Sequence, residues 1–277
     1  MKEKKKLTPG TILFYLIPVI AGAAAIIFGY LYMKDYLKYK EAADEYADIN
    51  DNYIKIMEDT GEPADVYDER TDYFPTLSID FQELKSINDS MACVLYVPAL
   101  DMTYPVVYSK DNEDYLHKTF EGKYNFAGCI FYDYLSERNF KGYNTFIFGH
   151  NMKNGSMFGT LKKFNQEPEL AASNPYFYIY TDGQVRKYEI FSYYQTVGSS
   201  KTYDDILSEE DYDAYIDRAL KNSNFTEYTG DIQFNERPGM VTLSTCSGRS
   251  GGSERFVVHG AQISTKNPSK GKRLNIK

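Results

Sequence analysis

The sequence predicts a mostly β domain that follows an N-terminal transmembrane helix. From about residue 92 onward, short apolar runs of strand length recur between turn residues, and an uncharged apolar stretch of membrane-spanning length precedes them. The aromatic content supports β structure, with 27 Tyr and 17 Phe in 277 residues, because aromatic side chains favour strands. The length allows one sizeable domain with accessory segments.

The N-terminal segment has the composition of a membrane anchor. Lysines at positions 2 and 4–6 precede an apolar stretch, residues 12–33, whose 22 residues span roughly 33 Å as a helix. The lysines predict that residues 1–11 are cytoplasmic and that the remaining chain lies outside the cell. A cleaved signal peptide is the alternative, because the small residues 21–25 could hold a cleavage site. The apolar stretch continues beyond them, which favours an uncleaved anchor.

Residues 34–75 are expected to form a juxtamembrane helix and a linker. Residues 34 to about 60 are charged and lack strand alternation, whereas residues 61–75 are polar and contain two prolines. A helical turn is expected around Phe81–Ile87. The folded domain is expected over residues 76–265, followed by a basic C-terminal tail, residues 266–277.

Eight strands are expected in this domain, and their number and spacing predict a closed barrel or a sandwich. They are Cys93–Val97, Tyr104–Tyr108, Cys129–Tyr134, Thr145–Gly149, Tyr176–Tyr180, Lys187–Thr196, Met240–Thr245 and Arg255–Ile263. A helix is expected between the sixth and seventh strands. Ser208 is an N-cap candidate with an acidic residue three positions on, and apolar residues from Tyr212 to Leu220 follow at helical spacing.

The charge and the cysteine pattern argue against several classes of protein. The net charge of −8, without a basic patch among the aromatics, argues against a nucleic-acid binder. Cys93, Cys129 and Cys246 are too few and too widely spaced for a disulfide framework, and no C-x-x-C supports zinc or thioredoxin chemistry. The acidic clusters at 204–205 and 209–211 lack the spacing of a calcium loop. No metal or cofactor is expected. Cys93 and Cys129 lie in apolar runs and are expected to be buried.

Cys246 is the strongest candidate for a reactive residue. It follows a strand-like run, and a Gly/Ser-rich loop separates it from a second run that starts at Arg255. If the two runs pair as a hairpin, Cys246 and Arg255 are neighbours, and strand alternation places Thr242 and Ser244 on the face of Cys246. A nearby cation favours the thiolate that a nucleophile requires. Arg249 competes for this role, but it lies in the loop rather than on a strand.

The proton acceptor must be one of three histidines. His150 ends a strand-like run, and strand ends and the loops beyond them commonly carry catalytic groups. His259 lies inside an apolar strand and is expected to be packed, whereas His117 is expected at the surface. On these residues alone, a Cys–His–Arg site and a buried, structural Cys246 both remain open.

Several segments resemble sortases, in order and along most of the chain. Thr242–Cys246 resembles the T-L-x-T-C signature, with the arginine at the start of the next strand, and Phe148–Met152 is similar to the region that holds the sortase histidine. Four further stretches resemble class B members: Tyr104–Tyr108, Asp111–His117, Gly128–Tyr134 and Gly155–Lys162. The inserted helix also points to class B. The resemblance covers roughly residues 76–264. It departs at Cys93, where class B members often have an aromatic residue, and at Phe148, where the family often has Tyr or another apolar residue.

The resemblance implies an eight-stranded sortase-type β-barrel and transpeptidation at the outer face of a Gram-positive membrane. Cys246 would attack the threonine carbonyl in the C-terminal sorting motif of a secreted protein, giving a thioester. His150 would protonate the leaving amine and then deprotonate an incoming amine, from a peptidoglycan precursor or another protein. Arg255 would stabilise the oxyanion or hold the substrate backbone. Three residues would line the substrate groove: Ser244, Asn112 and Leu116.

Other functions have weaker support. An L,D-transpeptidase-like enzyme has His and Gly directly before its cysteine, where this chain has Ser244 and Thr245. A papain-like peptidase has its cysteine before its histidine, the reverse of the order here. A non-catalytic, membrane-anchored binding module and a pilin-polymerising sortase are the remaining alternatives. For the transpeptidase, reference pKa values near 8.5 for Cys and 6.5 for His predict low turnover and a bell-shaped pH profile.

Overall fold

The computed structural model of the protein describes residues 9–57, 70, 72–226, 228, 232–246 and 252–267, apart from the side chains of Thr11 and Cys246. The chain forms two compact units, Met1–Asp44 and Glu45–Lys277. Arg249, nearly all of the predicted cytoplasmic tail and C-terminal tail, and most of the predicted linker lie outside the described residues.

The described part of the first unit is helical. Helix α1 (Pro9–Tyr53) begins in this unit and ends in the second, and it contains Pro18. Among the described residues, the stretch that starts at Ile12 is the one helix long and apolar enough to cross a membrane. Its large apolar side chains from Ile12 to Leu37 are exposed. The predicted apolar stretch and the helix predicted after it are therefore parts of one helix.

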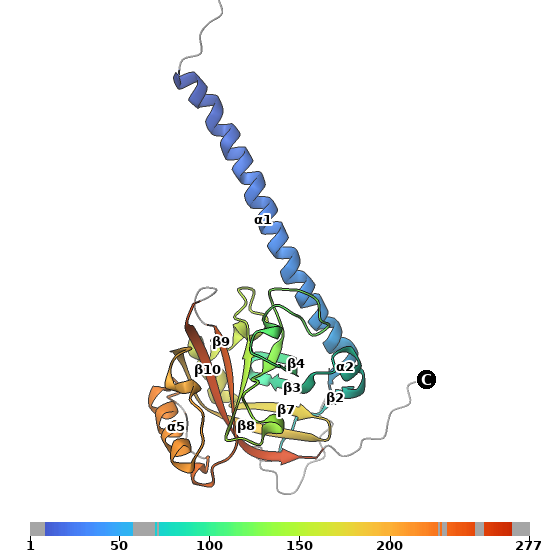
Figure 1. Ribbon diagram of the computed structural model, residues 1–277, viewed down its shortest axis with the longest axis vertical. Helices are drawn as coiled ribbons and strands as arrows, with labels where there is room; N and C mark the ends of the chain where they lie inside the picture. The colour runs from blue at the N-terminus through green and yellow to red at the C-terminus, as the bar shows by residue number, and fades with distance from the viewer. Residues whose placement is uncertain are drawn as a thin grey trace, which may run out of the picture. The chain divides into compact units, whose positions relative to one another are not determined.

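The second unit contains a closed barrel (Figure 1). In chain order the barrel strands are β3 (Met91–Val97), β4 (Met102–Tyr108), β5 (Ile130–Tyr132), β6 (Asn144–Gly149), β7 (Tyr176–Thr181), β8 (Gln184–Val197), β9 (Met240–Cys246) and β10 (Glu254–Lys266). Around the barrel their order is β10-β8-β7-β3-β4-β5-β6-β9. The pairs β4–β5 and β6–β9 are parallel, and the others are antiparallel. All eight predicted strands are present, and the barrel rather than the sandwich is confirmed.

A short ribbon and small helices lie outside the barrel. They are β1 (Ile54–Ile56), β2 (Leu77–Ile79), α2 (Phe81–Ile87), α3 (Lys163–Gln166) and α4 (Glu169–Ser173). The α2 helix has the predicted bounds. The antiparallel ribbon of β1 and β2 was not predicted, because three-residue strands carry too little alternation to be recognised.

Helix α5 (Glu209–Asn222) connects the sixth and seventh barrel strands, as predicted. Its first turn is closed by a capping box. The Asp211 backbone N–H donates to Ser208 Oγ at 3.1 Å, and the Ser208 N–H donates to the Asp211 carboxylate at 3.0 Å. These reciprocal bonds satisfy N–H groups that have no partner inside a helix.

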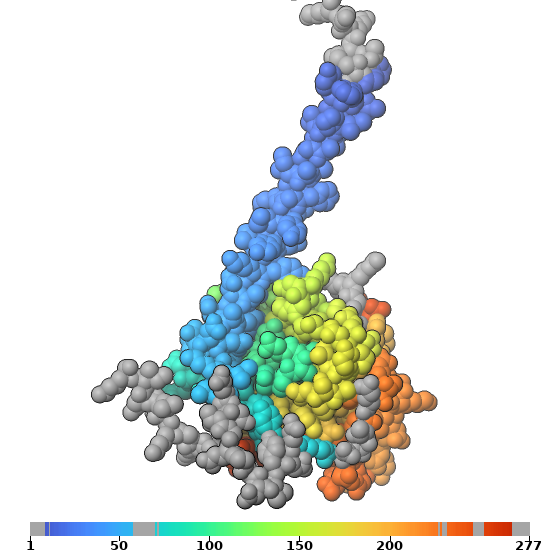
Figure 2. All heavy atoms as spheres, turned by 180° about the vertical axis from the view of Figure 1, so that it is seen from behind, coloured from blue at the N-terminus to red at the C-terminus, as the bar shows by residue number. Residues whose placement is uncertain are grey.

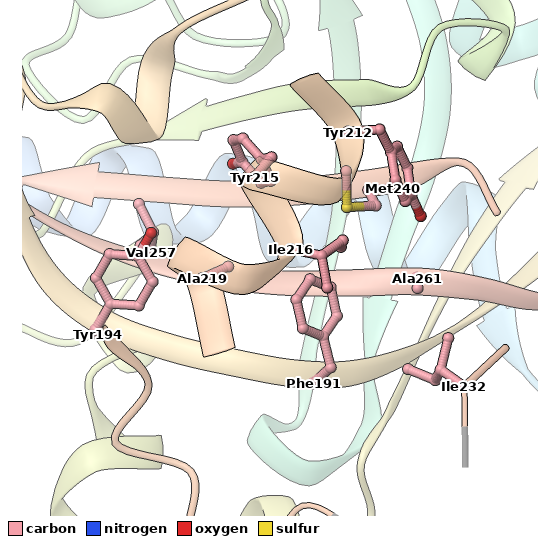
Figure 3. Close-up of a cluster of buried hydrophobic side chains, with 10 residues drawn as sticks. All are labelled: Phe191, Tyr194, Tyr212, Tyr215, Ile216, Ala219, Ile232, Met240, Val257 and Ala261. Carbon is pink, nitrogen blue, oxygen red and sulfur yellow. The ribbon is translucent and has the colours of Figure 1, made fainter. Parts of the chain in front are cut away.

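The buried face of α5 packs on the outside of the barrel (Figure 3). The cluster contains Phe191, Tyr194, Tyr212, Tyr215, Ile216, Ala219, Ile232, Met240, Val257 and Ala261. Full burial of one large apolar side chain contributes roughly 1.5–3 kcal/mol, so the cluster fixes the helix against β8, β9 and β10. From behind, the yellow segments around residues 160–190 lie beside the orange segment that contains α5 (Figure 2).

Candidate functional site

The register of three neighbouring strands brings three predicted site residues to one rim of the barrel. In the parallel pair of β6 and β9, Gly149 is opposite Thr245, so His150 and Cys246 both follow this pair directly. In the antiparallel pair of β9 and β10, Cys246 is opposite Arg255, which confirms the predicted hairpin. Neighbouring strands lie about 5 Å apart. The backbones of the three residues are therefore adjacent.

The segment before β5 fixes the ring of His150. Its Nε2 lies 2.7 Å from the carbonyl oxygen of Leu116. A carbonyl can only accept a hydrogen bond, so Nε2 carries the proton and Nδ1 is the basic atom of the neutral ring. Burial lowers the pKa of His150 below 6.5 because it disfavours the charged form. The bond to Leu116 raises this pKa, and the nearby His117 lowers it further.

Backbone contacts hold the Leu116 carbonyl in position. The N–H of Cys129 donates to the carbonyl of Tyr115 at 3.0 Å, and the N–H of Asn125 donates to the carbonyl of His117 at 2.9 Å. Gly128 has a φ of +60°, and a Cβ at this position would lie 2.6 Å from the Leu116 carbonyl oxygen. Both the backbone conformation and the close approach require glycine here.

The side chain of Arg255 is half-buried at the start of β10. Its Nη1 donates to the carbonyls of Gly252 and Glu254, both at 2.8 Å. These bonds orient the guanidinium next to the rim. A cation at this position favours the ionised form of a neighbouring thiol and can stabilise a developing oxyanion.

The three residues predicted to line a substrate groove have different surroundings. Ser244 is buried, and its Oγ lies 2.7 Å from the Tyr203 hydroxyl. Asn112 Nδ2 donates to Asp133 Oδ1 at 2.6 Å, which attaches Asn112 to the loop after β5. Leu116 is half-buried and provides the carbonyl that binds the histidine at the rim. The described contacts therefore connect Leu116 directly to the rim, and Ser244 lies two residues before Cys246.

Two residues near the rim were absent from the predicted site. His117 is exposed, as predicted, but its ring stacks on that of His150 with the centroids 6.0 Å apart and the planes 17° from parallel. Tyr203, in the connection from β8 to α5, stacks on Phe146 and Phe148 at 5.4 and 6.4 Å. The signal for His117 was its place directly after Leu116. Nothing in the sequence marks Tyr203, which lies 41 residues from its partner Ser244.

The remaining cysteines and His259 are structural. Cys93 and Cys129 are free and buried, as predicted. Burial raises the pKa of Cys129 to about 12 and also raises the pKa of Cys93. His259 is buried with its Nδ1 2.9 Å from Thr242 Oγ1, and burial lowers its pKa to about 3. None of the three titrates near neutral pH.

The acidic cluster at 209–211 belongs to the start of α5. Asp211 closes the capping box, and Glu209 forms an ion pair with Arg237 at 3.1 Å. Within the described part of the chain, no group of three or more His, Cys, Asp or Glu side chains could hold a metal ion.

Sequence comparisons connect this barrel to characterised proteins. Residues 95–263 match the sortase domain family. Sortase B of Listeria monocytogenes is 32% identical over 170 residues, which cover 60% of this chain and 67% of that protein. Sortase B of Staphylococcus aureus is 24% identical over 251 residues, which cover 90% of this chain and 95% of that protein.

Solved structures show the same likeness. Sortase B of Clostridium perfringens is 32% identical with a TM-score of 0.60, covering 66% of this chain and 100% of that chain. Sortase B of B. anthracis in complex with AAEK1 is 28% identical with a TM-score of 0.65, covering 82% of this chain and 99% of that chain. A substrate complex of Staphylococcus aureus sortase B is 25% identical with a TM-score of 0.60, covering 68% of this chain and 85% of that chain.

Proposed function

This chain belongs to the class B sortases, a family of cysteine transpeptidases, and on that premise we propose that Cys246, His150 and Arg255 carry out the transfer. The observation that carries the proposal is the strand register, which makes the backbones of these residues neighbours at one rim. A nucleophile, an acid–base group and a fixed cation are the groups that acyl transfer through a thioester needs.

In the first half of the reaction, the Cys246 thiolate attacks the threonine carbonyl of a C-terminal sorting motif. A carbon–sulfur bond forms, and the amide carbon–nitrogen bond breaks. The leaving amine takes a proton from His150, whose Nδ1 is the atom not bound to Leu116. Arg255 stabilises the negative charge on the carbonyl oxygen in the tetrahedral intermediate. The product is a thioester between Cys246 and the secreted protein.

In the second half, an amine of a peptidoglycan precursor attacks the thioester. His150 accepts the proton of this amine, and Cys246 leaves as the thiolate. The secreted protein is then joined to the precursor through a new amide bond. The apolar part of α1, residues 12–33, holds the enzyme in the membrane, with residues 1–11 in the cytoplasm and the barrel outside the cell.

A peptide assay on the full-length chain in detergent tests this function. We expect a pool of quenched fluorescent peptides with Thr-containing sorting motifs to be cleaved after Thr, and intact mass to show an acyl adduct. Both signals should vanish in Cys246→Ala and persist in Cys93→Ala, the matched control at a buried cysteine. Adding a cell-wall stem peptide or a lysine peptide, one at a time, identifies the accepting amine.

Alkylation separates this function from a non-catalytic binding module. Cys93 and Cys129 are buried, so an accessible Cys246 should be the one thiol that reacts in the folded protein. An unreactive Cys246, together with the absence of cleavage and of an adduct, would favour the binding module.

A further inference from the structure

His117 contacts His150 although the transfer chemistry above does not use it. We propose that His117 is a positioning residue, whose ring holds the His150 imidazole in place and whose protonation opposes that of His150. The inference deepens the proposed function, because it rests on His150 as the group that moves the proton.

The backbone of His117 is fixed well enough to position a neighbouring ring. Its carbonyl accepts a hydrogen bond from the Asn125 N–H at 2.9 Å, and the next residue, Lys118, forms a β-bridge with Tyr124. The ring of Tyr124 lies 6.0 Å from that of His117. An exposed side chain with two ring neighbours and an anchored backbone has less freedom than an ordinary surface histidine.

Leu116 and His117 restrain His150 in different ways. The Leu116 carbonyl binds Nε2 at 2.7 Å, which fixes one atom of the ring. That bond alone still permits the ring to rotate about its Cβ–Cγ bond. The stacked ring of His117, with its plane 17° from that of His150, opposes this rotation. The orientation of Nδ1 is then fixed, and efficient proton transfer requires a fixed orientation of the acid–base atom.

The charges around His150 come from three elements. His117 faces it from the segment before β5, and the strand register brings Cys246 on β9 and Arg255 on β10 to the same rim. Two stacked imidazolium ions repel each other, so a charged His117 disfavours a charged His150. The lowered pKa of His150, caused first by burial and also by His117, agrees with this geometry. Removing the charge of His117 should therefore raise the pKa of His150.

Histidine NMR of the full-length chain in detergent tests the charge coupling. The chain has three histidines, so ¹³C-labelling at Cε1 gives one signal for each. We expect His117→Phe, which keeps a ring and removes the charge, to raise the titration midpoint of His150 by about half a pH unit. The buried His259 is an internal reference for folding. An unchanged His150 midpoint would overturn the coupling.

Peptide cleavage tests the positioning. We expect His117→Phe to keep kcat within about twofold at pH 7.5, and His117→Ala to lower kcat roughly tenfold with little change in KM. Glu121→Ala removes an exposed side chain of the same loop, whose ion pair is with Lys123 at 2.6 Å, and should leave kcat unchanged. Wild-type kcat in His117→Ala would overturn the positioning role.

Two controls keep the outcomes distinct. A shifted His259 signal in His117→Ala would report a folding defect, and His117→Gln, which lacks the ring but stays polar, would then give the decisive kcat. Wild-type activity in His150→Ala would refute the proposed function itself. The NMR coupling between His117 and His150 does not depend on that result.

Discussion

The hydroxyl oxygens of Tyr203 and Ser244 lie 2.7 Å apart, and Ser244 is two residues before Cys246 on β9. Ser244 is 1% exposed. A substrate that bonds to its hydroxyl must therefore displace Tyr203, which belongs to the connection between β8 and α5.

We expect Tyr203→Phe to lower the free energy of unfolding by about 1 kcal/mol and to lower KM for the cleaved peptide. The stability falls because one hydrogen bond is lost, and KM falls because the Ser244 hydroxyl becomes free to bind substrate. Urea unfolding and steady-state kinetics measure the two effects. Tyr194→Phe, which loses a contact of 3.1 Å with Thr202, is the matched control for stability and should leave KM unchanged. An unchanged KM in Tyr203→Phe would make Ser244 a structural residue.

Substitution of Gly128 should reduce activity through the Leu116 carbonyl. Gly128 and Gly122 both have positive φ, +60° and +84°, so the backbone conformation alone makes alanine at either position cost about 1 kcal/mol of stability. Only at Gly128 would the new Cβ meet the Leu116 oxygen, at 2.6 Å. We expect Gly128→Ala, but not Gly122→Ala, to lower kcat at least tenfold. Equal kcat values for the two variants would contradict the role of this carbonyl in holding His150.

The pH dependence of kcat/KM should be bell-shaped, with its acid limb below pH 6.5. Cys246 and His150 together can bind two protons, and the active form of the pair carries one of them. As the pH rises through the lower of the two macroscopic pKa values, this form appears and kcat/KM rises. That value belongs mainly to His150, whose pKa is lowered by burial. Initial rates of peptide cleavage from pH 4.5 to 10 measure the profile. A flat profile would count against the Cys–His pair.

His259 should make the protein less stable in acid. Its pKa is about 3 in the folded protein and about 6.5 in the unfolded chain, so between these values the unfolded chain binds more protons. The contribution is present in full above pH 6.5 and is lost as the pH falls. From pH 7.5 to 5.5 the loss is about 1.4 kcal/mol. Urea unfolding at the two pH values measures this loss, and we expect it to be smaller in His259→Phe by this amount.

Glu45 should be the residue through which the end of α1 stabilises the loop near the rim. Its buried carboxylate accepts from Thr119 Oγ1 at 2.9 Å and from the Glu121 N–H at 3.0 Å, and lies 3.7 Å from Lys123 Nζ. We expect Glu45→Ala to lower the free energy of unfolding by about 2–3 kcal/mol. Asp48→Ala, at an exposed position on the same helix, should change it by less than about 0.5 kcal/mol. Comparable losses in the two variants would contradict this role.

Much of the barrel could be predicted because its signals are local. Each strand has its own apolar run, and the start of α5 is marked in the sequence by the capping-box pair Ser208 and Asp211, three residues apart. The pairing of Cys246 with Arg255 also followed from local order, because a hairpin aligns the end of one strand with the start of the next. The predicted catalytic roles of the rim residues remain proposals.

The features that the sequence did not predict depend on contacts between segments that are distant along the chain. The ribbon of β1 and β2 joins two three-residue strands across a predicted linker. Leu116 was predicted to line the substrate groove, but it holds His150 through a backbone carbonyl, which no residue type reveals. The burial of Ser244 depends on Tyr203, and nothing near either residue predicts that contact.

The parallel pairing of β6 with β9 sets the geometry of the rim independently of the connection from β8 to β9. The relative position of His150 and Cys246 depends on strand register and not on the length of chain that joins β8 to β9. Residues 198–239 could therefore be exchanged between relatives, provided that Tyr203 and the face of α5 that packs on the barrel are kept. Such chimaeras offer a route to peptide ligases that differ in this connection and keep the same arrangement of His150 and Cys246.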